Sequence, residues 1–219
     1  AFLPKAFKSQ NHIAEIQGVY VPFWLFDAEA DARGSYDGQV SESHREGDYR
    51  VTTTQHYDVR REGTATFARV PVDGSSKMPD EHMDSIEPFD YSELKPFSTA
   101  YLPGFLADRY DEDAKTCADR AKTRIENSTA EALRQTLSEY AVVDTREENI
   151  NVRMKKAHYT LLPVWMLHTR WKDKDFLFAM NGQTGRLIGD LPVDKSRVAA
   201  WFAGISLPLM AVLAFLLLL

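Results

Sequence analysis

The sequence predicts an α+β protein built mainly on an antiparallel sheet, with one long helix and a C-terminal transmembrane helix. Residues 49–59 alternate with a period of two, which is typical of a strand. Small apolar residues recur every three or four positions over 112–139, which indicates a helix packed on a sheet. Residues 198–219 contain no Asp, Glu, Lys or Arg. Since about 20 apolar residues can cross a bilayer, we expect a soluble domain at 1–197 and a membrane helix at 198–219.

The first half of the sheet is predicted from three segments. Residues 19–26 (VYVPFWLF) are aromatic and β-branched, and the chain then alternates between acidic residues and alanine up to Ala32. After the strand at 49–59, Arg61 to Gly63 reads as a turn, and residues 64–72 form a hairpin partner. We therefore expect a meander of three antiparallel strands.

A Pro-rich segment at 73–111 follows, with one short helix near 79–86. Its many aromatic and aliphatic residues are too apolar to leave in water, so the segment is predicted to wrap around the domain. Within it, a loop of four residues is a candidate site for docking a partner protein: Leu102, Pro103, Gly104 and Phe105.

The helix at 112–139 is predicted to begin at a capping carboxylate, either Asp111 or Asp113. Cys117, the single cysteine of the chain, falls on its apolar stripe, so we interpret it as a packing thiol and not as a nucleophile. Polar residues at 127–129 interrupt the stripe and predict a bend or a second cap.

The second half of the sheet is predicted from residues 158–169 and from a hairpin at 176–189 with an Asn181-Gly182 turn. Residues 21–26 and 162–167 share the order apolar, Pro, apolar, Trp, apolar, apolar. This shared phrase suggests two related β units. The proline in each indicates a strand edge or a bulge.

The net charge of −6 argues against a nucleic-acid partner, because binding to phosphates requires a basic surface. The expected partners are instead the lipid bilayer and other membrane-associated proteins, and the sequence does not fix an oligomeric state. Lys195 and Arg197 precede the apolar run, which places the soluble domain in the cytoplasm by the positive-inside tendency. Five residues are predicted to contact the membrane: Trp201, Phe202, Gly204, Pro208 and Phe215.

Several phrases in this order resemble a family of bacterial membrane proteins: GVYVPFWLFDAEADARG, ELKPFSTAYLPGFLADRYD, LLPVWMLHTRW and FAMNGQTGRLIGDLPVDKSR. Members of this family carry an N-terminal zinc ribbon of the transcription-factor-B type and are sometimes mislabelled primosomal helicase-like. The resemblance implies a cytoplasmic zinc ribbon, this α+β domain and membrane helices, with a role in envelope stress or membrane protection. No Cys-x-x-Cys pair occurs in the chain, so zinc is expected only in a ribbon before Ala1.

No common catalytic motif is present, and the sequence predicts no catalytic, cofactor-binding or metal-ligating residue. We therefore expect a non-enzymatic, membrane-anchored interaction or scaffold protein that presents a sheet edge or the Pro-rich segment to its partners. One alternative is a small-ligand receptor or enzyme with a pocket near Trp24 and Trp165. Another is an accessory subunit of a large membrane complex, in which small residues near Pro208 form a helix-packing face.

Overall fold

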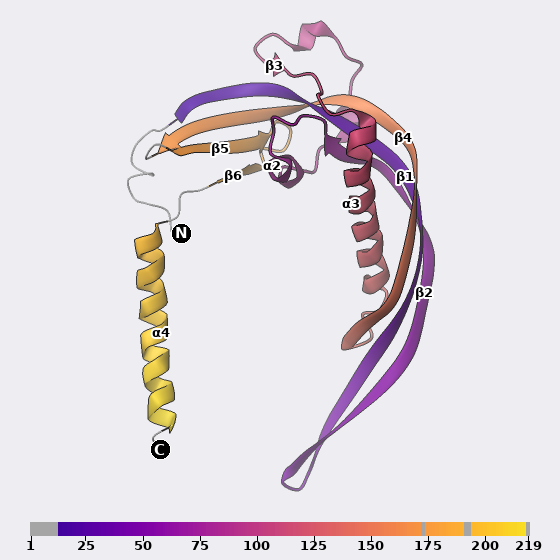
Figure 1. Ribbon diagram of the computed structural model, residues 1–219, viewed down its shortest axis with the longest axis vertical. Coiled ribbons are helices and arrows are strands. Elements are labelled where there is room, and N and C mark those ends of the chain that lie inside the picture. Colours follow the sequence, from indigo (N-terminus) through magenta and orange to yellow (C-terminus); the bar gives the residue numbers. More distant parts are fainter. Residues whose placement is uncertain (1–12, 172–173, 191–193, 218–219) are drawn as a thin grey trace.

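A six-stranded sheet is the framework of the protein (Figure 1). The structure, a computed structural model, describes residues 13–171, 174–190 and 194–217. The strands run in the order β2 (Tyr49–Asp73), β1 (Ile13–Glu46), β4 (Val142–Trp171), β5 (Lys174–Asn181) and β6 (Leu187–Gly189). The short β3 (Leu106–Ala107) pairs with β1 in parallel, whereas all other neighbours are antiparallel. The α+β class and the mainly antiparallel sheet are confirmed.

The first hairpin differs from the predicted meander. β1 and β2 pair along almost the whole length of β2, and the chain reverses at Gly47, whose φ of 61° suits a tight turn. The turn expected at Arg61 to Gly63 is wrong, because these residues pair in register with Gly34 to Ala32. Arg61 is half-buried and Glu62 and Gly63 are exposed, so both faces of this edge strand accept polar or small residues and the REG sequence does not end it.

The two similar phrases lie side by side at the centre of the sheet. Val21 of β1 pairs with Leu162 of β4, and both side chains are buried. On either side of this pair, Pro22 faces Leu161 and Pro163 faces Tyr20. The phrases are therefore related by a local two-fold axis through the Val21–Leu162 pair, which supports the suggestion of two related β units.

The repeat extends to the partner strands. Phe23 pairs with Asp73 at the end of β2, and Val164 pairs with Asn181 at the end of β5. In each half a glycine follows, and its amide donates a 2.9 Å hydrogen bond to the carbonyl of the strand proline: Gly74 to Pro22, and Gly182 to Pro163. Each unit is thus a long strand and an antiparallel partner that ends in a buried polar residue followed by glycine.

Helix α3 (Ala114–Gln135) covers one face of the curved part of the sheet (Figure 1). Its N-cap is Asp113, whose side chain accepts from the Thr116 amide at 2.8 Å, so this predicted cap is confirmed. Cys117 is buried against Phe26, as expected of a packing thiol. The helix runs without a break through 127–129, where the Thr129 hydroxyl donates to the Ile125 carbonyl one turn earlier.

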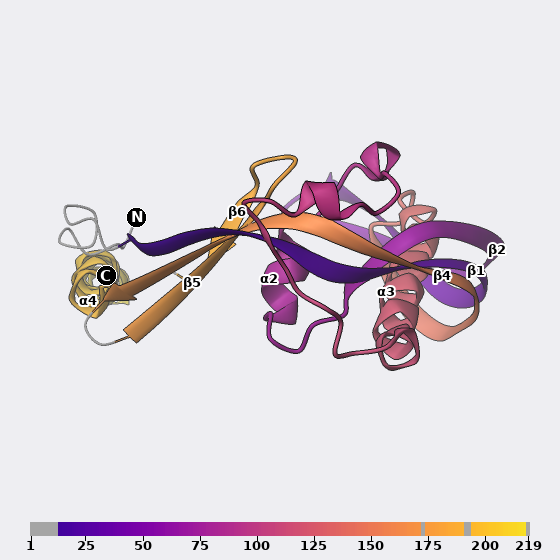
Figure 2. The same cartoon turned by 90° about the horizontal axis from the view of Figure 1, so that it is seen from above.

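The other face carries a second core closer to β5 and β6. Phe23 packs there with Met83 of α2 (Asp80–Ser85), with Ile86 and with Phe89. The segment then continues through two short turns, η1 (Tyr91–Glu93) and η2 (Thr99–Tyr101), to β3. Figure 2 shows α2 and α3 at different positions along β1. The wrapping of the Pro-rich segment and its short helix agree with the prediction.

The prediction of a C-terminal transmembrane helix is wrong. The chain forms helix α4 (Lys195–Leu217), but no helix in the described residues is both long and apolar enough to cross a membrane. Helix α4 begins with Lys195 and Arg197 in its first turn, and Gly204, Ser206 and Pro208 interrupt the apolar run.

The five residues predicted to contact the membrane lie on α4. The side chains of Trp201 and Phe202 are 63% and 74% exposed, and Gly204 and Pro208 lie on the exposed surface of the same helix. The side chain of Phe215 is outside the described residues, as is the end of the predicted span at 218–219.

The close approach of Gly182 to Pro163 generates a test of the repeat. A Cβ at position 182 would lie 2.8 Å from both the Cβ and the carbonyl oxygen of Pro163, so Gly182→Ala forces the backbone apart. We expect it to lower the free energy of unfolding by about 1–3 kcal/mol, measured by chemical denaturation. Gly63→Ala is the matched control, since no atom lies within 4 Å of its Cβ position. Equal stability of the two variants would contradict the close packing of the repeat.

Candidate functional site: the free edge and open face of the sheet

The odd-numbered residues of β1 point to one face of the sheet and change character halfway along the strand. Val19, Val21, Phe23 and Leu25 are buried on this face, where the Pro-rich segment and α2 pack. From Asp27 onward the same face becomes polar and carries Asp27, Glu29, Asp31, Arg33, Ser35 and Asp37. The even-numbered residues of this second half are mostly small, and Ala28 and Ala30 pack against Ile125 of α3. One face of the long strands is therefore closed by α3, and the other is open.

Cross-strand ion pairs cover the open face. The carboxylates of β1 face basic residues of β4: Glu29 contacts Lys155 and Arg153, and Asp31 contacts Arg153. Hydrogen bonds from Lys155 hold the pKa of the Glu29 carboxyl below its usual value, and those from Arg153 do the same for the pKa of Asp31. Because these pairs are exposed, each adds little stability, and their main effect is to order the polar surface.

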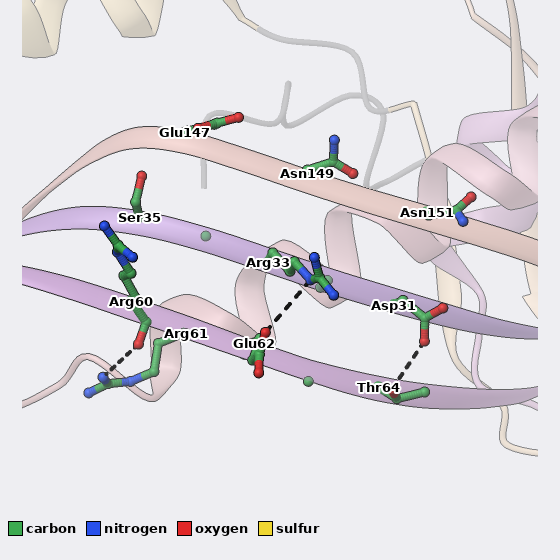
Figure 3. Close-up of a pocket in the computed structure, with 13 residues that line it drawn as sticks. Asp31, Arg33, Ser35, Arg60, Arg61, Glu62, Thr64, Glu147, Asn149 and Asn151 are labelled. Atoms are coloured by element: carbon green, nitrogen blue, oxygen red, sulfur yellow. Dashed lines mark hydrogen bonds and ion pairs between the residues drawn. The ribbon is translucent and has the colours of Figure 1, made fainter.

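A hollow of about 1310 Å³ lies on this open face, over the middle of β1, β2 and β4 (Figure 3). Its labelled lining residues are acidic, basic, hydroxyl and amide side chains: Asp31, Arg33, Ser35, Arg60, Arg61, Glu62, Thr64, Glu147, Asn149 and Asn151. Arg33 lies 3.6 Å from Glu62, and Thr64 donates to Asp31 at 3.1 Å. The mixture of donors and acceptors suits a polar chain laid across the strands.

A smaller cavity of about 540 Å³ lies where the apolar half of this face meets the polar half. Both neighbours of β1 bulge here: the register shifts between Phe26 and Ala28 against β2, and between Asp27 and Ala28 against β4. Arg69 of β2 adopts a φ of 57°, and its amide donates to Asp27 Oδ1 at 2.9 Å. This backbone hydrogen bond is the main reason why the pKa of Asp27 lies below its usual value. His158 Nε2 lies 3.2 Å from the other carboxylate oxygen.

Strand β2 is the outer strand of the sheet, so one of its edges has no neighbouring strand among the described residues. From Tyr49 to Phe67 it pairs with β1 without a register shift, and nearly every side chain is exposed or half-exposed. Pairing of β1 with β4 ends at Gln39, so residues 40–55 project as a two-stranded ribbon (Figure 1). The described part of the chain therefore presents a long, regular strand edge.

The predicted docking loop is only partly available to a partner. The Phe105 ring packs against Tyr20 and Trp165, with ring centroids 5.1 and 5.2 Å apart, and fills the space where a Cβ on Gly18 would lie. Pro103 and Gly104 are exposed at the tip, and Leu102 is half-buried. Exposed apolar side chains flank the loop, including Phe97 and Leu106. The loop itself stays a prediction as a docking site.

The two tryptophans of the predicted pocket lie in separate aromatic clusters. Trp24 packs between Tyr110 and Tyr159, each with its ring centroid 5.2 Å away, and its indole donates to the Glu112 carbonyl at 3.0 Å. Trp165 packs on Phe105. Neither side chain lines the two cavities described above, although Tyr159 borders the smaller one.

A charged cluster at the end of β2 was not predicted from the sequence. Asp73 is buried and accepts from Arg120 of α3 at 2.6 Å, and Arg120 also contacts Asp80 and Asp84 at 2.8 Å. Burial raises the pKa of Asp73 to about 6, and the second carboxylate oxygen has no hydrogen-bond partner in the described residues. The sequence does contain a signal for the equivalence of Asp73 and Asn181, because each is followed by a glycine. These residues lie outside the two similar Trp-containing segments, so comparison of those segments alone does not find them.

Comparison with known proteins gives a relative in Bacillus subtilis, the uncharacterized protein YdjG. The chain is 38% identical to it over 203 residues, which is 93% of the chain and 60% of that protein. The chain thus spans about three fifths of the length of this relative. No protein-family model and no solved structure matches the chain. The resemblance to zinc-ribbon membrane proteins stays a prediction.

The raised pKa of Asp73 predicts a specific pH dependence. In the unfolded chain this carboxyl has a pKa near 3.8, and in the folded protein its pKa is about 6, so the folded state holds the extra proton between these values. Stability should therefore fall as pH rises through this window, by up to about 3 kcal/mol.

The matched variant is Asp73→Asn, which gives the first repeat the amide that Asn181 supplies at the equivalent position of the second. We expect the variant to lose this part of the pH dependence, measured by urea denaturation at pH 4, 5, 6 and 7. Parallel stability curves for the variant and the wild type would show that Asp73 stays ionised in the folded protein.

Proposed function

We propose that this chain is a non-enzymatic interaction domain that binds other proteins by strand addition along the free edge of β2. The observation that carries the proposal is the unbroken pairing of β2 with β1 from Tyr49 to Phe67. Every second residue of such an edge strand turns its amide and carbonyl away from the sheet, where an added strand can pair with them. A proline or a bulge would block this pairing, and neither occurs in this stretch.

The projecting ribbon supports the same proposal. Isolated two-stranded hairpins are marginally stable in water, and residues 41–50 are exposed throughout. Hydroxyl pairs such as Ser41–Thr54 and Ser43–Thr52, at 2.9 and 2.8 Å, order one face of the ribbon but bury little apolar surface. A third strand would supply the missing backbone hydrogen bonds. The ribbon is therefore best explained as a surface that is completed by a partner.

A pair of neighbouring proline variants tests the proposal. Successive amides of β2 point alternately toward β1 and away from it, so one of Thr52→Pro and Thr53→Pro removes an outward amide and the other breaks the β1–β2 pairing. The variant that keeps the wild-type melting temperature identifies the outward position. We expect this variant to lose more than tenfold in affinity for a protein that co-purifies stoichiometrically with the wild type.

The control is the equivalent threonine-to-alanine substitution, which keeps the amide and should keep binding. Retention of the same partner by the folded proline variant would exclude the edge as the binding surface. In that case, the apolar side chains around Pro103 and Gly104 become the next surface to substitute.

A second candidate function is binding of a small anion in the cavity beside Asp27. Both carboxylate oxygens of Asp27 already take part in hydrogen bonds, with the Arg69 amide and with His158. The remaining charged groups on the lining are cationic and include Lys95 and Lys155. A ligand there would therefore carry negative charge, with its apolar part against Leu94.

Titration calorimetry with inorganic phosphate and with benzoate tests this candidate. We expect binding that weakens at least fivefold in Lys95→Ala, while Lys115→Ala, on α3 and outside the cavity, should leave binding unchanged. Equal binding by both variants would indicate unspecific attraction of the anion.

A further inference from the structure

We propose that the strand added to β2 is the β2 strand of a second copy of this chain, antiparallel to it and related by a two-fold axis at Val59. This inference rests on the proposed function, because it names the partner that occupies the same edge. An antiparallel pair of identical strands is self-complementary, and each copy contributes the same surface to it.

The length of the regular edge limits the register to axes near its middle. Pairing of β2 with β1 is unbroken from Tyr49 to Phe67, so an axis far from the centre of this stretch would leave much of the edge unpaired. With Val59 on the axis, residues 51–67 of the two copies pair within the unbroken edge, and Tyr49 faces Arg69 at the bulge. An axis at Asp58 uses the edge as fully, so strand length alone does not choose between these two axes.

The charges favour the same register. Across the axis, Asp58 faces Arg60 of the second copy, and His56 faces Glu62, each pair occurring twice because of the symmetry. All four positions lie on the open face, since they pair with odd-numbered residues of β1 between positions 33 and 39. No two like charges face each other between Tyr49 and Arg69.

Moving the axis by one residue still places side chains of the open face opposite each other, but the charges then disfavour the pairing. Moving the axis to position 58 places Asp58 against its own copy, and moving it to position 60 places Arg60 against Arg60 and Asp58 against Glu62. Like charges directly opposite each other destabilise a strand pair. The pattern of alternating charge at 56–62 thus discriminates between this register and its nearest alternatives.

The apolar residues of β2 agree with this arrangement. On the face that α3 covers, Val51 lies opposite Phe67 of the second copy, and Tyr57 lies opposite Arg61, where an aromatic ring can receive a guanidinium. Tyr57 is 41% exposed, and its ring lies against the ring of Tyr140 with 5.7 Å between the centroids. Pairing would cover this exposed ring.

Charge exchange between two chains tests the proposal. Asp58→Arg places two basic side chains opposite each other across the axis, and Arg60→Asp places two acidic side chains there. Each variant alone should therefore self-associate at least tenfold more weakly than the wild type, measured by analytical ultracentrifugation. When the two variants are mixed, every facing pair again has opposite charges, and the mixed dimer should regain wild-type affinity. Changes within one chain, such as loss of the Asp58 contact with Arg146, persist in the mixture and cannot produce this recovery.

The register is tested with single cysteines on the full chain, in a mild detergent that prevents association through the exposed helix α4. Thr54 faces Thr64 in this register, so differently tagged Thr54→Cys and Thr64→Cys chains should form a mixed disulfide, seen on a non-reducing gel. The pair Thr54→Cys and Thr66→Cys is the control and should not. The native Cys117 is buried and does not interfere.

Absence of the mixed disulfide, equal disulfide formation by the control pair, or no recovery in the charge-exchange mixture would overturn self-pairing. If self-pairing is overturned but the folded proline variant no longer binds another protein that co-purifies with the wild type, the edge is an interaction site for that protein. In that case only the assignment of a second copy fails. If the proline variant loses nothing, the proposed function itself fails.

Discussion

The strict alternation of side chains along β1 is the constraint on which the rest of the structure depends. From Glu15 onward β1 carries no extra residue, so its side chains alternate strictly between the two faces up to the turn at Gly47. The bulges that adjust the sheet over this stretch are placed in its neighbours, and both neighbours bulge beside Asp27. Because of this regularity, a change from apolar to polar residues at alternate positions of β1 changes one face of the sheet from buried to exposed. The two apolar cores and the open polar face follow from it.

The two cores close different parts of the strand. On the odd-numbered face, Phe23 and its neighbours are covered by α2 and the Pro-rich segment. On the even-numbered face, the alanines at 28 and 30 leave room for α3 to approach the sheet closely. The buried polar residue at the end of each partner strand holds a neighbouring segment in place. Asp73 accepts from Arg120 of α3. The Asn181 amide donates to the carbonyls of Ile86 and Pro88 at 2.9 and 3.0 Å. Equivalent positions thus hold neighbouring segments by different chemistry.

Local patterns in the sequence predict the strands, the helix cap at Asp113 and the packing of Cys117, because each depends on neighbours in the chain. The hairpin turn was misplaced, since a charged tripeptide on an exposed strand resembles a turn. The transmembrane helix was inferred from the apolar run alone. The site was harder to foresee: the polar face requires knowing that α3 covers the alanines and not the acids, and the Asp73 cluster joins residues more than 40 positions apart.

The ribbon also determines how far the protein can reach. From Gln39, where pairing with β4 ends, to the turn at Gly47, the two strands extend on their own for roughly 26 Å at about 3.3 Å per residue. The tip of the ribbon thus lies far from Arg60, which is in the part of β2 that β1 and β4 support. The hairpin is in this sense a spacer whose length is set by the register of β4.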